Sequence, residues 1–138
     1  MINISQLFKI LIPSKNISLR TLKAEQKICV EFANYLRERT LKGDFGYIWF
    51  HIPNEFSSYN PIYGLKMGWM GRVPGVADFC FVGKDKSFFI EFKTLKGVLS
   101  PSQKIFESWC TAHQVNYFIA HSSEEGIKIV EDALNEKF

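Results

Sequence analysis

One segment of the chain combines a carboxylate and an ammonium group with large apolar side chains: Ser87–Thr94, with the sequence SFFIEFKT. Its aromatic composition is typical of a β-strand. Because side chains alternate along a strand, Glu91 and Lys93 would share one face, and the other face would be wholly apolar. A charged pair in such a strand costs free energy unless the two groups pair or hold a cation. The alternative is an edge strand whose outer face is simply hydrated.

Asp78 lies in the preceding apolar segment, Val76–Val82, thirteen positions before Glu91. The four residues 83–86 between the segments are typical of a turn, so the two strands are predicted to form a hairpin in which Asp78 and Glu91 converge. Two carboxylates and a strand carbonyl, such as that of Phe92, would form an oxygen-only site. Mg²⁺ and Mn²⁺ prefer such ligands. Lys93 would then orient or activate a water molecule at the site.

Three further polar residues have two interpretations each. Glu25 lies near the start of a predicted helix. It either complements the helix dipole, or it binds the metal or contacts one of the metal's ligands. Gln103 is the third residue of a capping box that begins at Ser100, but its amide could also reach Glu91. His51 ends an aromatic segment and either contacts phosphate or water near the site or is an ordinary strand-end histidine.

The elements that must position these side chains indicate the α/β class, with a mixed sheet flanked by helices in the order α-β-β-β-α-β-α. Residues 1–18 show the least pattern and are interpreted as an N-terminal arm. The expected elements are a helix over Thr21–Arg39, a strand over Tyr47–Ile52, a long loop over Pro53–Pro74, strands over Val76–Val82 and Ser87–Thr94, a helix from Ser100, a strand over Val115–Ala120 and a helix over Glu124–Asn135.

Composition narrows the class of protein. A chain of 138 residues fits a single domain, residues 1–138, and it contains no apolar run of the ~18 residues that a membrane span requires. The three cysteines are an odd number, far apart and without CxxC spacing, which disfavours a disulfide framework or zinc knuckle and favours the reducing cytoplasm. The net charge is +3, but residues 1–42 hold eight Lys and Arg against three acids. This basic end would suit a polyanion, although a hydrated helix surface is the simpler interpretation.

Three short motifs, taken in order, resemble the signature of the PD-(D/E)XK nucleases, and more narrowly of their VRR-NUC branch. They are Gly75–Asp78 (GVAD), Glu91–Lys93 (EFK) and Leu99–Gln103 (LSPSQ). In that branch a G-x-P-D strand precedes E-x-K and then S-x-x-Q, and a glutamate lies on an N-terminal helix. The resemblance covers roughly residues 25–131. Ala77 stands where the branch usually has proline, which changes backbone stiffness and not ligand chemistry.

This resemblance implies a restriction-endonuclease-like core and hydrolysis of DNA phosphodiester bonds with Mg²⁺ or Mn²⁺ as cofactor. Carried over residue by residue, it implies that Asp78, Glu91, Glu25 and the Phe92 carbonyl hold the metal. It implies that Lys93 positions or activates the attacking water and that Gln103 supports the site. Small stand-alone members look like phage or prophage proteins, are often homodimers, and in some cases act on branched DNA such as four-way (Holliday) junctions.

DNA binding would come mainly from contacts between basic side chains and phosphates, and it would weaken with salt. The candidates for these contacts are Lys23, Lys27, Arg72, Lys96 and Lys104. Two alternatives to a junction endonuclease stay open: a restriction-like or end-processing nuclease, and a non-catalytic DNA-binding module that keeps the nuclease fold. The intact set of charged residues argues against the module.

Overall fold

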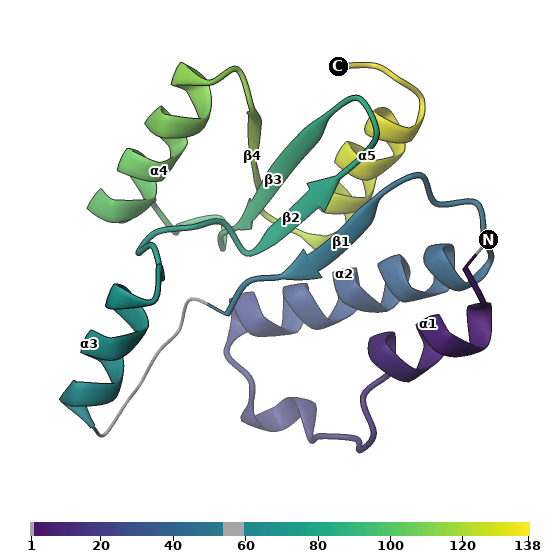
Figure 1. Ribbon diagram of the computed structural model, residues 1–138, viewed down its shortest axis with the longest axis horizontal. Coiled ribbons are helices and arrows are strands. Elements are labelled where there is room, and N and C mark those ends of the chain that lie inside the picture. Colours follow the sequence, from purple (N-terminus) through teal and green to yellow (C-terminus); the bar gives the residue numbers. More distant parts are fainter. Residues whose placement is uncertain (1, 54–59) are drawn as a thin grey trace.

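The computed structural model describes residues 2–53 and 60–138 and has helices packed on a mixed four-stranded sheet (Figure 1). This confirms the α/β class. The strands are β1 (Ile48–His51), β2 (Phe79–Val82), β3 (Ser87–Phe92) and β4 (Asn116–Ala120). The helices are α1 (Ile4–Leu11), α2 (Ala24–Leu41), α3 (Pro61–Trp69), α4 (Pro101–Ala112) and α5 (Ser123–Leu134), with a 3₁₀ turn η1 (Leu19–Thr21).

The sheet has the strand order β1-β2-β3-β4, so β3 is an interior strand. Strand β2 is antiparallel to both β1 and β3, and β4 runs parallel to β3. The hairpin predicted between β2 and β3 is therefore confirmed, with Phe79 opposite Ile90. The alternative interpretation of the Glu91 segment, an edge strand with a hydrated outer face, is wrong because β3 has a neighbour on each side.

An aromatic core fills the space between the sheet and the helix pair α2 and α5. Phe32 of α2 is fully buried, and its ring meets those of Phe79 and Phe92 at centroid distances of 5.0 and 4.9 Å. Phe88 and Ile90 extend the same core along β3. The predicted apolar face of this strand is thus confirmed. Burial of large side chains of this kind is the main favourable contribution to folding.

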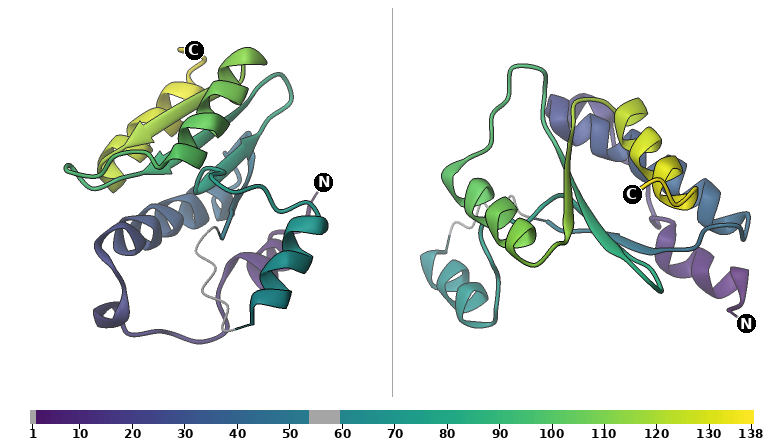
Figure 2. Two further views of the ribbon diagram at one scale, coloured as in Figure 1. Left: turned by 90° about the vertical axis from the view of Figure 1, so that its left-hand side faces the viewer. Right: turned by 90° about the horizontal axis from the view of Figure 1, so that it is seen from above.

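Helix α4 covers the opposite face of the sheet (Figure 2). Phe106 and Cys110 of α4 form a smaller buried cluster with Ala77, and Phe89 of β3 packs against it. Because Glu91 follows Phe89 by two positions, its side chain projects to this same face. Because side chains alternate along β3, the Glu91 carboxylate lies on the α4 side of the sheet, among mostly apolar side chains.

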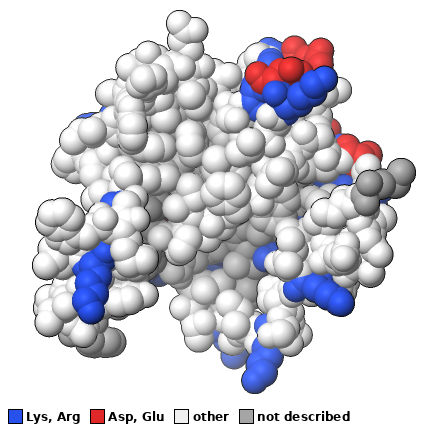
Figure 3. Space-filling view, in the orientation of Figure 1, with Lys and Arg blue, Asp and Glu red and all other residues white. Residues whose placement is uncertain are grey.

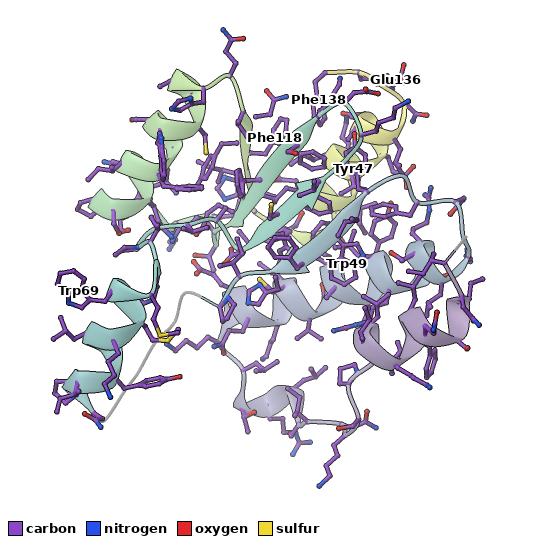
Figure 4. The ribbon with its side chains drawn as sticks, viewed as in Figure 1. Tyr47, Trp49, Trp69, Phe118, Glu136 and Phe138 are labelled. Atoms are coloured by element: carbon purple, nitrogen blue, oxygen red, sulfur yellow. The ribbon has the colours of Figure 1, made fainter. Side chains whose placement is uncertain are left out.

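Aromatic side chains pack together at the turn end of the hairpin. Phe138 at the C-terminus packs on Phe88 and Phe118 with ring centroids 5.5 and 4.8 Å apart, and Tyr47 packs on Phe88 at 5.3 Å (Figure 4). The Lys86 ammonium lies 5.5 Å from the centre of the Phe138 ring. Asp78 and Glu91 lie at the opposite end of the hairpin, where β3 ends at Phe92.

Two helices were not expected from the sequence. The proposed arm over residues 1–18 contains α1, which is capped by the side chain of Asn3 and tied to α2 by a 2.8 Å hydrogen bond from Arg37 Nε to the Leu11 carbonyl. The predicted loop over Pro53–Pro74 contains α3, capped by the side chain of Asn60, while its residues 54–59 lie outside the described part. The predicted order of elements is therefore incomplete.

The element bounds also move the site residues slightly. Helix α2 begins at Ala24 rather than Thr21, and β2 begins at Phe79, so Asp78 precedes the strand instead of lying within it. Across residues 2–53 and 60–138, the structure contains no helix with both the length and the apolar character that crossing a bilayer demands.

Replacing Phe32 with alanine should lower the free energy of unfolding by about 3–5 kcal/mol, because it leaves a cavity among buried rings. The matched control is Trp69→Ala on α3, since Trp69 is 85% exposed and points away from the sheet (Figure 4). That change should stay within about 0.5 kcal/mol. Denaturant titrations of the three proteins measure both effects, and equal losses would contradict the assigned core.

Candidate active site

Asp78 and Glu91 meet at the open end of the β2–β3 hairpin. The register that pairs Phe79 with Ile90 places these two residues opposite each other. Asp78 Oδ2 accepts a 2.7 Å hydrogen bond from the Phe92 N–H, and the Asp78 carbonyl accepts one of 2.7 Å from Ile52 N. The Asp78 backbone and side chain are therefore both fixed by neighbouring strands, and the backbone of Phe92 lies at the site.

Glu91 is a carboxylate buried within the sheet, only 2% exposed. Its Oε1 atom accepts a 2.6 Å hydrogen bond from Gln103 Nε2 and lies 3.6 Å from Lys93 Nζ. Its Oε2 atom is buried and makes no hydrogen bond of normal geometry with the described residues, although the backbone N–H of Asp78 lowers the pKa of this carboxyl against the stronger effect of burial. A buried carboxylate oxygen without a partner is costly, so this atom identifies the place where a cation would be most stabilising.

Gln103 has both of its proposed roles at once. Its Oε1 accepts from Ser100 N at 2.8 Å, and its own N–H donates to Ser100 Oγ at 3.3 Å, which together form the predicted capping box. Its Nε2 is then directed to Glu91. Because the cap fixes the amide oxygen, the orientation of the amide nitrogen is fixed as well, and the start of α4 holds Glu91 in place.

Lys93 continues the ladder beyond the end of β3, with its N–H donating to the Ala120 carbonyl at 2.9 Å. The carbonyl of Lys93 lies 3.1 Å from His121 Nδ1. Its side chain is 13% exposed, and its ammonium lies 3.6 Å from Glu91 Oε1, the same oxygen that Gln103 contacts. The lysine thus has a fixed backbone and a nearly buried side chain beside the partnered oxygen of Glu91.

Glu25 approaches the same end of the sheet from the first turn of α2. Its Oε1 accepts a hydrogen bond of 3.4 Å from the backbone N–H of Thr94, two residues after β3. Burial is the main cause of the raised pKa of Asp78, and the charge of Glu25 adds to it. The helix-dipole role and the site role are therefore compatible, since Glu25 lies in the first turn of α2 and its charge also acts on Asp78.

The charges at this site are strongly coupled. Burial, reinforced by the neighbouring Asp78 carboxylate, raises the pKa of Glu91 to about 8, while Lys93 opposes the rise. Burial also raises the pKa of Asp78, against the stabilising hydrogen bond from Phe92. The three acidic groups Glu25, Asp78 and Glu91 outnumber the single Lys93, so acidic charge predominates in this poorly hydrated region.

The predicted metal ligands Glu25, Asp78 and Glu91 offer carboxylate oxygens, the donors that Mg²⁺ and Mn²⁺ prefer. Among the described residues, however, the group of three acidic, histidine or cysteine side chains whose ligand atoms converge within 4.8 Å is Cys29, His51 and Asp78, and not these three carboxylates. The proposed fourth ligand, the Phe92 carbonyl, belongs to a residue whose N–H donates to Asp78. The metal and the ligand roles assigned to these residues therefore stay predictions.

Four of the five candidate DNA-binding residues surround this end of the sheet and are exposed. Lys23 is the N-cap residue of α2 and Lys27 lies in its first turns, on either side of Glu25 in the sequence. Lys96 lies three positions after Lys93, and Lys104 follows Gln103. Arg72, in the connection from α3 to β2, is only half-exposed. On the face drawn in Figure 3, acidic side chains lie at the upper right, and the lower half shows Lys and Arg without acids.

Sequence reasoning missed two features near the site. The Tyr117 hydroxyl of β4 is buried without a partner among the described residues, and burial together with the charge of Glu91 raises its pKa. Cys29, His51 and Asp78 bring their ligand atoms within 4.8 Å of one another. The four-residue spacing of Glu25 and Cys29 on one helix face was a signal for the second feature. The pairing of β1 with β2 was not visible in the sequence.

Neither the known protein-family models nor the characterised proteins nor the solved structures give a significant match to this chain.

Gly75 lets the segment before Asp78 pass close to the start of α4. Its φ is +83°, and a Cβ atom there would lie 2.3 Å from the Ser102 carbonyl carbon. Gly75→Ala should therefore displace the turn that carries Gln103 and cost roughly 2–5 kcal/mol of unfolding free energy. Gly68→Ala in α3 is the control, since a Cβ there meets nothing within 4 Å. Denaturant titration measures both, and a wild-type stability for Gly75→Ala would contradict this packing.

The raised pKa of Glu91 predicts a stability that depends on pH. Between its usual value of 4.5 and about 8, the folded protein holds a proton on Glu91 that the unfolded chain has released. The free energy of unfolding in EDTA should therefore fall as pH rises across this range, by on the order of a few kcal/mol. Glu91→Gln should remove most of this slope. Denaturation at pH 5 and pH 8 tests it, and parallel pH profiles for the two proteins would refute the assignment.

Proposed function

We propose that this protein is a metal-dependent nuclease that hydrolyses DNA phosphodiester bonds, with a restriction-endonuclease-like core of the VRR-NUC type. The single observation that carries the proposal is the buried Oε2 atom of Glu91, which has no hydrogen-bond partner among the described residues. It belongs to a carboxylate that lies opposite Asp78 and pairs with Lys93 through its other oxygen. A carboxylate with only a structural role would have both oxygens paired or hydrated. The order of the GVAD, EFK and LSPSQ motifs supports the same assignment.

Each residue then has a distinct task. Gln103 contacts one oxygen of Glu91, and the other oxygen would bind the cation. Asp78, whose Oδ2 accepts a hydrogen bond from the Phe92 N–H, would share that cation. When bound, Mg²⁺ or Mn²⁺ would neutralise phosphate oxygens and lower the pKa of a coordinated water. Lys93 would orient the attacking water through a hydrogen bond.

In the hydrolysis itself, the water oxygen forms a new bond to phosphorus, one ester bond breaks, and the leaving oxygen takes up a proton. The buried walls around Glu91 strengthen the electrostatic contributions of Lys93 because the local dielectric constant is low. The deficit of positive charge at the site in the metal-free protein favours uptake of the cation.

The exposed lysines around the site suit a phosphate backbone on both sides of the cleavage point. Lys23 and Lys27 lie at the start of α2, as its N-cap residue and within its first turns. Lys96 lies in the connection from β3 to α4, and Lys104 lies in the first turn of α4. Binding through phosphates is independent of sequence, so recognition would depend on DNA shape. We propose branched DNA, such as a four-way junction, as the substrate.

Helix α3 supports a homodimer as the active form. It and the residue that follows it expose large apolar side chains, among them Leu65, Trp69 and Met70. Apolar surface of this kind is typical of an interface. Two copies related by a twofold axis could cut a symmetric junction in paired positions.

The activity is tested by incubating the purified full chain with a labelled four-way junction and with a linear duplex of the same sequence, in Mg²⁺, Mn²⁺ or EDTA. Cleavage should require the metal and favour the junction. Glu91→Gln, Asp78→Asn and Lys93→Ala should each lower the rate by about 100-fold or more, because each removes a ligand or the residue that orients the water.

Lys84→Ala is the matched control for Lys93→Ala, since Lys84 is exposed in the turn at the other end of the hairpin. It should retain the wild-type rate. Absence of cleavage with every metal and substrate, with junction binding intact, would favour the non-catalytic DNA-binding module. Preferential cleavage of the duplex or its ends would favour the restriction-like or end-processing alternative.

A further inference from the structure

A second set of donor atoms lies beside the three carboxylates and has different chemistry. One ligand atom each from Cys29, His51 and Asp78 lies within 4.8 Å of the other two. The three residues come from α2, from the last position of β1 and from the residue before β2. They combine a thiol, an imidazole and a carboxylate at the same end of the sheet as Glu91.

The backbone around this cluster is well fixed. Ile52 N donates to the Asp78 carbonyl at 2.7 Å, which holds the end of β1 against the start of β2. The His51 ring packs on Phe79 at a centroid distance of 5.1 Å. Cys29 lies one helical turn after Glu25, so α2 presents both residues toward this end of the sheet. Hence the three donors converge through the fold and not through a flexible loop.

The chemistry of the three donors, a thiol, an imidazole and a carboxylate, indicates which metal the cluster would bind. Thiolate and imidazole prefer zinc over magnesium, and a tetrahedral zinc ion with three protein ligands keeps a fourth position open. Zinc bonds of about 2.0–2.3 Å place ligand atoms roughly 3.3–3.8 Å apart, so small side-chain rotations from the present separations suffice. His51 is exposed, which gives an ion a route of entry.

We propose that Cys29, His51 and Asp78 form a binding site for Zn²⁺, separate from the carboxylate set but sharing Asp78 with it. The other two cysteines are not members of the cluster. Because Asp78 belongs to both donor sets, zinc at this site would compete with the proposed Mg²⁺ for one ligand. This inhibitory consequence rests on the proposed nuclease function, whereas zinc binding itself does not.

The test titrates Co²⁺, a spectroscopic substitute for Zn²⁺, into the full-length protein. The wild type should bind one Co²⁺ per chain with a thiolate-to-cobalt charge-transfer band, and Zn²⁺ should displace it. Cys29→Ser should abolish the band. His51→Ala, at an exposed position, should weaken Zn²⁺ binding by about 10-fold or more in competition with a chromophoric chelator. Cys110→Ala is the matched cysteine control and should retain the band.

Glu91→Gln separates this site from the nuclease proposal, because it should abolish Mg²⁺-dependent cleavage and leave the cobalt band in place. A band in the wild type without any DNA cleavage would support the zinc site while the nuclease proposal fails. The zinc site is overturned if the wild type shows no thiolate band, if Cys29→Ser keeps it, or if Glu91→Gln removes it.

Discussion

A carboxylate in an interior strand is the constraint on which this structure depends. Glu91 lies in β3, with β2 on one side and β4 on the other, and it is almost entirely shielded from water. Such a group is tolerated only if its charge is balanced or removed. Here Gln103 and Lys93 balance one oxygen, and the other lacks a partner, so the metal-free protein tends to take up a proton there. A divalent cation would satisfy the same need, which links the strain of the metal-free fold to the proposed chemistry.

The rest of the fold holds this group in place. An aromatic core on the α2 and α5 side gives β3 a rigid backing, while α4 covers the other face. The first turn of α4 is anchored by its own capping box, and its close approach to Gly75 couples it to the segment that leads into Asp78. Helix α4 therefore positions both carboxylates. Its Gln103 amide contacts Glu91, and its packing against Gly75 constrains the segment that leads to Asp78. The capping box thus stabilises the start of α4 and also orients the Gln103 amide toward Glu91.

The sequence predicted the parts of this arrangement that local patterns encode. The alternation in Ser87–Thr94 identified the buried charge, and the capping box at Ser100 identified the start of α4. Helix α3 was missed although Asn60 and Pro61 are good start signals, because Gly64 and Gly68 gave its segment the composition of a loop. The approach of Cys29 to His51 could not be predicted, since it depends on which strand pairs with β2 and on how α2 packs across the sheet end. Strand pairing and helix packing depend on contacts between residues far apart in the sequence, which local patterns do not encode.

The sharing of Asp78 has a consequence for how the two donor sets can act. Its Oδ2 is already bound to Phe92 N–H, so the carboxylate has limited freedom to turn from one set to the other. A hard ion held by the carboxylates and a softer ion held by Cys29 and His51 would therefore need the Asp78 carboxylate in two different orientations. Since zinc binds nitrogen and sulfur donors far more strongly than magnesium does, a low concentration of zinc would outweigh a large excess of magnesium at this carboxylate. The identity of the ion at the sheet end would then decide whether the carboxylates are free for phosphodiester chemistry.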